Sequence, residues 1–165
     1  MKQNRRAFLK LVTGAGALMA MGFTGTRTSQ KRGPVKIVLL HTNDVHSHID
    51  PFPDNDPKYA GLGGVERRAS LIKKIRAEEE HVLLLDAGDI FQGTPYFNLY
   101  GGELEMKLMS EMGYDASTIG NHDFDAGLDN LAKQMAHATF PMINCNYDFT
   151  GTPREGKTQP YKIFN

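Results

Sequence analysis

The sequence of 165 residues contains one cysteine, no tryptophan and no net charge. With Cys145 alone, the chain forms neither an intrachain disulfide nor a cysteine-based zinc site, and we expect this residue to be a small buried side chain. Its 19 basic and 19 acidic residues cancel, which argues against a partner that is a nucleic-acid polymer bound through a basic surface. The remaining composition, with 40% hydrophobic residues, is typical of a globular protein.

The cancelling charges are segregated along the chain. Residues 1–33 contain seven basic residues and no acidic one. Residues 34–165 therefore contain 12 basic and 19 acidic residues, and their formal charge is −7. We expect two regions with different roles, a targeting segment at residues 1–33 and a folded domain at residues 34–165.

The targeting segment has a basic start followed by an apolar run. Arg5 and Arg6 precede Phe-Leu-Lys, and residues 11–23 are rich in glycine, alanine and other apolar residues. The run is shorter than the roughly 20 residues of a membrane-spanning helix, and the pattern resembles a twin-arginine signal peptide. It implies export by the twin-arginine (Tat) machinery to the periplasm, cell envelope or exterior. An amphipathic N-terminal helix is the alternative, and an uncleaved signal would remain as an anchor.

Residues 34–165 alternate between short apolar runs and helical patterns. Strands are expected at residues 35–40, 82–85, 116–119 and 141–145, with a fifth beginning at residues 161–164. Helices are expected at residues 65–80, 102–112 and 127–137. In the second helix, Leu104, Leu108 and Met112 are expected to lie on one face. This alternation predicts an α/β fold with a largely parallel sheet.

Polar side chains follow the first three strands. Because the carboxyl ends of parallel strands meet at one edge of the sheet, these side chains are expected to converge in one crevice. Carboxylate, amide and imidazole groups suit Mn, Fe or Zn, and a carboxylate can bridge two such ions. The candidate metal ligands are Asp44, His46, Asp89 and Asn121. Each alone has an ordinary alternative, such as a strand-terminating turn or a left-handed residue beside a glycine.

His122 and Asp125 form a second candidate pair. Their spacing of three residues allows the carboxylate to reach an imidazole nitrogen in a helical turn. A histidine held in this way can act as a general acid or stabilise developing negative charge. Alternatively, Asp125 is an N-cap for the helix that begins near Gly127.

Three blocks carry a family resemblance: LHTNDVHSH at residues 40–48, GD at residues 88–89 and GNHDFD at residues 120–125. In order and spacing they resemble the calcineurin-like metallophosphoesterases, and among these most closely the exported 5′-nucleotidases. The resemblance implies the N-terminal half of a four-layer α/β/β/α sandwich with two divalent metal ions that hydrolyses a nucleotide or another phosphate ester. It assigns one metal to Asp44 and His46, the bridging position to Asp89, and the second metal to Asn121. It makes His122 and Asp125 the catalytic dyad, with Asn121 and His122 contacting substrate.

Several alternatives stay open within this resemblance. A 2′,3′-cyclic nucleotide phosphodiesterase or a sulfur-ester hydrolase would carry similar metal blocks, and a non-catalytic metal-binding remnant is a third possibility. The family completes its metal site with later histidines, including a Gly-His-x-His-type motif, and adds a separate nucleotide-binding domain. In this chain, His137 is the sole histidine after His122. The resemblance therefore implies a partial catalytic domain that binds metal weakly and has little activity by itself.

Overall fold

The computed structural model describes residues 33–165. The signal peptide expected at residues 1–33 lies, except for its last residue, outside the described residues. Within the described part of the chain, no helix is both long enough and apolar enough to cross a membrane.

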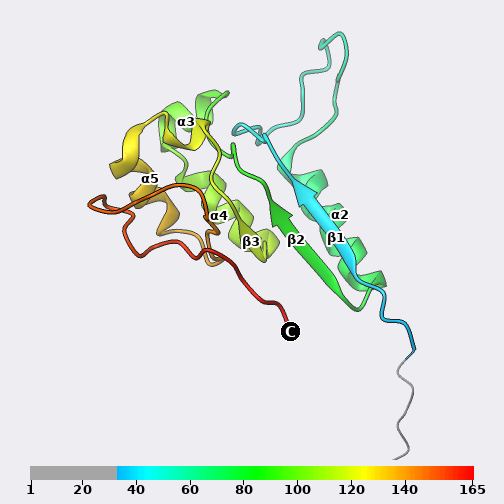
Figure 1. The fold of residues 1–165 in the computed structure, drawn as a ribbon. Helices are drawn as coiled ribbons and strands as arrows, with labels where there is room; N and C mark the ends of the chain where they lie inside the picture. Colours follow the sequence, from blue (N-terminus) through cyan, green and yellow to red (C-terminus); the bar gives the residue numbers. More distant parts are fainter. Residues whose placement is uncertain (1–32) are drawn as a thin grey trace, which may run out of the picture. The chain divides into compact units, whose positions relative to one another are not determined.

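A three-stranded parallel sheet forms the centre of the fold (Figure 1). Its strands β1 (Val38–Thr42), β2 (Val82–Asp86) and β3 (Ala116–Ser117) are adjacent in chain order. Helix α2 (Val65–Glu78) connects β1 to β2, and helices α3 (Pro95–Tyr100) and α4 (Glu103–Met112) connect β2 to β3. A 3₁₀ turn, η1 (His122–Phe124), and helix α5 (Gly127–Met135) follow β3. The predicted α/β fold with a parallel sheet is confirmed.

The helices cover one face of this sheet. Leu84, in the middle of β2, is 1% exposed and belongs to one core cluster with Ile72 of α2, Met109 of α4 and Leu131 of α5. Leu39 of β1 points the other way and is 64% exposed, because successive side chains of a strand alternate between the two faces. Burial of a Leu84-sized side chain contributes about 1.5–3 kcal/mol to folding, so the core anchors β2 between its neighbours.

The C-terminal part of the chain differs from the sequence prediction. The strand expected at residues 141–145 consists of isolated parallel bridges, Ser117 with Met142 and Ile143 with Gln159. No strand forms at residues 161–164, where Tyr161 and Ile163 are exposed and have no paired strand beside them. The prediction of a fifth strand is therefore wrong for the described chain, because an apolar run forms a strand only where a neighbour pairs with it.

Local burial differs in part from the sequence expectation. Helix α4 buries Met112 of the predicted face, and Leu108 packs against the core, but Glu105, Met106 and Met109 are buried as well. Its sequence carries apolar residues on more than one side, so packing against the sheet and α5 selects the buried face. Cys145 is exposed, because Met142 and Asn144 are the residues that point inward from this segment. Helix α3 was not predicted, although Thr94 followed by a proline at the first helical position is a typical helix start.

Candidate functional site

The loops after β1 and β2 run side by side beyond the ends of their strands. The backbone N–H of Asp44 donates to Gly88 O at 3.0 Å, that of His46 donates to Asp89 O at 3.1 Å, and that of Ser47 donates to Ile90 O at 2.9 Å. These bonds continue the parallel pairing of β1 and β2 past Thr42 and Asp86. The first two predicted motifs are thereby held together, as expected from the carboxyl ends of adjacent parallel strands.

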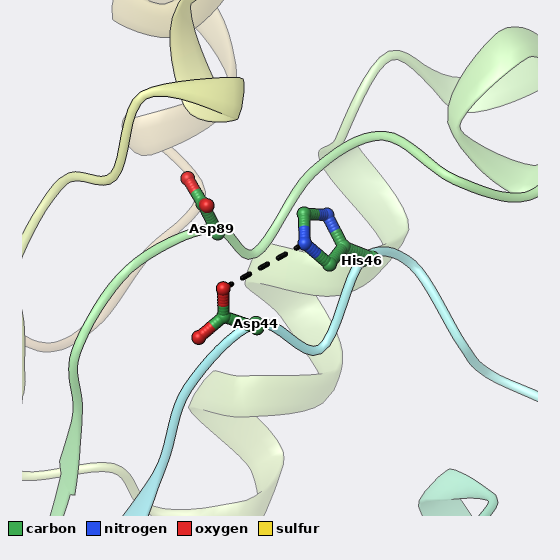
Figure 2. Close-up of side chains that lie close together, drawn as sticks. All are labelled: Asp44, His46 and Asp89. Atoms are coloured by element: carbon green, nitrogen blue, oxygen red, sulfur yellow. Dashed lines mark ion pairs between the residues drawn. The ribbon is translucent and has the colours of Figure 1, made fainter.

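Three predicted metal ligands converge at this edge. Asp44, His46 and Asp89 each offer a ligand atom, and these atoms lie within 4.8 Å of one another. Figure 2 shows Asp44 and His46 on the loop after β1, with Asp89 on the adjacent loop. The Asp44 Oδ1 and His46 Nε2 atoms are 3.9 Å apart. Two ligands of one ion, each about 2.1 Å from it, are separated by roughly 3–4 Å, so this pair fits a shared divalent ion.

A backbone contact orients the His46 ring. Its Nδ1 lies 3.2 Å from the carbonyl oxygen of Phe91, so a proton on Nδ1 has an acceptor there. That tautomer leaves Nε2, the nitrogen nearer Asp44, with a free lone pair. Metal-binding histidines characteristically use this arrangement, in which the second nitrogen donates to a carbonyl or carboxylate.

The same two loops contain unusual backbone conformations. Asp44, His46, Ser47, Asp89 and Gln92 all have positive φ, with φ values between 47° and 73°. Among described residues other than glycine, positive φ occurs only in these loops. Left-handed conformations of this kind cost about 1–3 kcal/mol each where the residue is not adapted to them, and they cluster at functional sites. The surrounding hydrogen bonds therefore hold the ligand loops in conformations that isolated segments would rarely adopt.

The third motif folds against the second. The His122 backbone N–H donates to Asp89 Oδ1 at 2.9 Å, and the Gly120 N–H donates to the Asp123 carboxylate at 2.8 Å. Asn121 lies between these two anchored residues, and its side chain is exposed. The backbone thus brings the residue of the fourth predicted ligand next to the Asp89 loop.

His122 and Asp125 form the predicted pair. His122 Nδ1 lies 2.8 Å from Asp125 Oδ2, and this hydrogen bond is the main cause that raises the pKa of His122 above its usual value. The His122 ring is also next to that of His46, with centroids 5.2 Å apart. The alternative role of Asp125 as a helix cap is wrong, because the N-cap of α5 is Ala126 and no side chain caps that end.

Two buried carboxylates near these loops were given no role from the sequence, although Asp86 was expected at the same edge of the sheet as Asp89. The first is Asp86, which accepts hydrogen bonds from Thr42 Oγ1 at 2.6 Å, Gly88 N at 2.9 Å and Ser117 Oγ at 3.1 Å. Thr42, Asp86 and Ser117 are register partners across the three strands, so this network ties the strand ends together beneath the loops. Burial raises the pKa of Asp86.

The second is Asp123, which is 1% exposed. Burial raises the pKa of Asp123, while backbone N–H donors from Gly120, Phe91 and Ile90 act in the opposite direction. The only sequence signal for either carboxylate is its place next to a motif, Asp86 at the end of an apolar run and Asp123 within GNHDFD.

The donor set decides what this site can hold. Two carboxylates and an imidazole converge here, and these are oxygen and nitrogen donors of the kind that bind Mn, Fe or Zn. The 4.8 Å convergence and the oriented His46 ring fit such ions. The residues present therefore fit a divalent metal centre.

Known proteins are similar to this chain in sequence. The sequence pattern of the family described as "Calcineurin-like phosphoesterase" matches residues 37–164. The snake venom 5′-nucleotidase of Gloydius brevicauda is 42% identical over 140 residues, which are 81% of this chain and 24% of that protein.

Solved structures agree with the sequence match. The 5′-nucleotidase precursor of Thermus thermophilus has a TM-score of 0.72 and 37% identity, with 78% of this chain and 26% of that chain covered. The NAD nucleotidase of Haemophilus influenzae has a TM-score of 0.71 and 30% identity, with 78% and 24% covered. The chain thus spans about a quarter of the length of these proteins. Because the family pattern extends over almost all of residues 33–165, the chain belongs to the calcineurin-like phosphoesterase family.

Proposed function

We propose that the full-length protein hydrolyses phosphate esters at a two-metal site, with nucleoside 5′-monophosphates as the substrate class. The observation that carries this proposal is the convergence of ligand atoms from Asp44, His46 and Asp89 next to the hydrogen-bonded pair of His122 and Asp125. The nucleotide class is supported by the names of the similar proteins, which are nucleotidases. In this proposal, residues 34–165 are the first part of the catalytic domain.

The ligands divide between two ions of Zn, Mn or Fe type. Asp44 and His46 would hold one ion, Asn121 would hold the other, and Asp89 would bind both through its two carboxylate oxygens. When bound, such ions neutralise phosphate charge and lower the pKa of a coordinated water towards about 7. The hydrogen bond from His122 N to Asp89 Oδ1 keeps that carboxylate facing the site.

The chain's own residues then handle the ester. The Nδ1–H of His122 donates a hydrogen bond to Asp125. The Nε2–H is then the group that can donate to a phosphoryl oxygen or protonate the leaving oxygen. Because Asp125 raises the pKa of His122, the charged imidazolium is favoured and attracts the anionic ester. The exposed Asn121 amide and the His122 ring are the proposed substrate contacts.

Two substitutions in the full-length protein test this division of roles. Asp89→Asn should lose Mn²⁺ binding, measured by calorimetry, together with hydrolysis of AMP and p-nitrophenyl phosphate. His122→Asn should keep Mn²⁺ binding and lose about 10²–10⁴-fold in kcat. Asp129→Asn on the exposed side of α5 and His81→Asn before β2 are matched controls, because both side chains are exposed and neither belongs to the ligand loops.

The outcomes of these experiments distinguish an enzyme from a non-catalytic, metal-binding remnant. Near-normal turnover by Asp89→Asn would contradict the bridging role, and loss of metal by His122→Asn would make that histidine structural. An unsubstituted protein that binds Mn²⁺ but hydrolyses none of these esters would support the non-catalytic alternative. Hydrolysis restricted to 2′,3′-cyclic nucleotides or to sulfur esters would replace the substrate class and keep the site.

We also propose that residues 1–33 direct export through the Tat machinery. Arg5 and Arg6, the following apolar run and the absence of acids in this segment support this role. Replacing both arginines with lysine should retain the protein in the cytoplasm, measured by cell fractionation and immunoblotting. Lys10→Arg is the control that preserves the arginine pair. Export of the double-lysine variant at the normal level would contradict the proposed route.

A further inference from the structure

Asp123 is a nearly inaccessible carboxylate that binds four backbone N–H groups. Its Oδ1 accepts from Ile90 at 2.9 Å and from Phe91 at 3.0 Å. Its Oδ2 accepts from Asp89 at 3.1 Å and from Gly120 at 2.8 Å. Because only 1% of its surface is exposed, this carboxylate cannot obtain comparable hydrogen bonds from water. Both oxygens are thus committed to the backbone of the two ligand loops.

Three of the four donors are consecutive residues of the Asp89 loop. Asp89 has a φ of 55°, and consecutive N–H groups that follow a left-handed residue can converge on one anionic group, an arrangement called a nest. Ile90 and Phe91 are buried, so their N–H groups would be left without partners if the carboxylate were absent. The carboxylate of Asp123 therefore stabilises the conformation in which Asp89 presents its side chain.

The fourth donor, Gly120, connects this loop to the third motif. The backbones of the two segments are in close contact there. A Cβ atom placed on Gly88 would lie 2.9 Å from Gly120 Cα, closer than real Cβ atoms approach. The Asp89 side chain also accepts from His122 N at 2.9 Å. Asp89 is consequently held at its backbone by Asp123 and at its carboxylate by His122, two residues of the same motif.

We propose that Asp123 is a positioning residue. It fixes the position and orientation of the Asp89 carboxylate relative to residues 120–122, so that the metal and the ester bind next to each other. This role rests on the proposed function of Asp89 and His122. Asp123 is not itself a ligand, because both of its oxygens face backbone N–H groups. Its effect is exerted through the geometry of the neighbouring side chains.

The test is Asp123→Asn in the full-length protein. The amide nitrogen cannot accept a hydrogen bond and would face two N–H donors. We expect Mn²⁺ affinity to fall about 10–100-fold, the range found when partners of metal ligands are replaced. We expect kcat for AMP to fall about 10²-fold with little change in KM. Calorimetry and steady-state kinetics measure these values, and circular dichroism establishes that the variant is folded.

Glu105→Gln is the matched control. Glu105 of α4 is 3% exposed, and within residues 33–165 its oxygens accept no hydrogen bond. A merely structural role of Asp123 would lower the melting temperature of Asp123→Asn and leave its metal affinity and kcat unchanged, as we expect them to be in Glu105→Gln. A folded Asp123→Asn variant with normal Mn²⁺ affinity and normal kcat would overturn the positioning role. If the unsubstituted protein neither binds Mn²⁺ nor hydrolyses AMP, the proposed function itself fails.

A second measurement does not depend on the variant folding. In the unsubstituted protein without metal, the N–H groups of Ile90 and Phe91 should be among the slowest to exchange with deuterium, because Asp123 holds them before any ion binds. Their exchange should change little when Mn²⁺ is added. Fast exchange that becomes slow only with Mn²⁺ would show that the ion, and not Asp123, orders the loop.

Discussion

Gly120→Ala is the smallest substitution that disturbs the Asp89 carboxylate. A Cβ atom on residue 120 would lie 2.7 Å from Asp89 Cγ, and the Asp89 backbone N and Oδ1 are closer still. Ordinary contact begins at 3.4 Å, so the carboxyl carbon has to retreat by at least 0.7 Å or the two loops have to separate. A comparable misplacement of about 1 Å costs roughly 10²-fold in catalytic rate.

The expected effects follow from that displacement. Mn²⁺ affinity should fall at least about tenfold, as when other supports of metal ligands are lost, and kcat for AMP should fall about 10–100-fold. Overpacking should also lower the free energy of unfolding by about 1–3 kcal/mol. Calorimetry, steady-state kinetics and urea denaturation of the full-length protein measure the three quantities.

Gly151→Ala separates the clash from the general cost of replacing glycine. Gly151 has a φ of 71°, and a Cβ there would have no neighbour within 4 Å. This variant should lose some stability through backbone strain and keep its metal affinity and kcat. A Gly120→Ala variant with metal affinity and kcat equal to those of the unsubstituted protein would refute the reasoning, since it would show that the carboxylate can move without consequence.

Three further predictions concern the core, the buried Asp86 and the exposed Asp125. Leu84→Ala should lower the free energy of unfolding by about 3 kcal/mol, whereas Leu99→Ala, at a position that is 76% exposed, should change it by less than about 0.5 kcal/mol; equal losses in urea denaturation would contradict the core assignment. Burial raises the pKa of Asp86 in the folded protein. The contribution of this group to the free energy of unfolding is therefore complete below about pH 3.9, the pKa of an aspartate in the unfolded chain, and it is lost as pH rises through the folded pKa. The melting temperature of the unsubstituted protein, relative to Asp86→Asn, should therefore decrease from about pH 4 towards neutrality, and an increase would refute this sign. Asp125→Asn should lower kcat about tenfold at unchanged Mn²⁺ affinity, because it weakens the 2.8 Å bond to His122; unchanged kcat would remove Asp125 from the mechanism.

The sequence allowed the three strands of the sheet, the main helices and the convergence of the motifs to be predicted. Residues 82–85 form a continuous apolar run, and the region of α2 has helical spacing of apolar residues, so both signals are local. Proximity of Asp44 and Asp89 followed from one rule, that parallel strands end at the same edge of a sheet. The structure places these side chains in one group.

Other features depend on contacts between distant residues and leave no local signal. The four donors to Asp123 include three residues more than 30 positions earlier in the chain. The left-handed conformation of His46 is supported by pairing with the Asp89 loop, and no sequence pattern marks it. The burial of Met106 and Met109 in α4 has the same origin, because the sequence of this helix has apolar residues on several sides and tertiary packing chooses among them.

The most direct test of the metal centre is a crystal structure of the full-length protein grown with Mn²⁺, with anomalous diffraction used to locate the ions. The account predicts two Mn²⁺ ions that share the Asp89 carboxylate, one bound by Asp44 and His46 and the other by Asn121. Anomalous peaks at other residues, or ions at this edge of the sheet that leave Asp89 unbound, would contradict it.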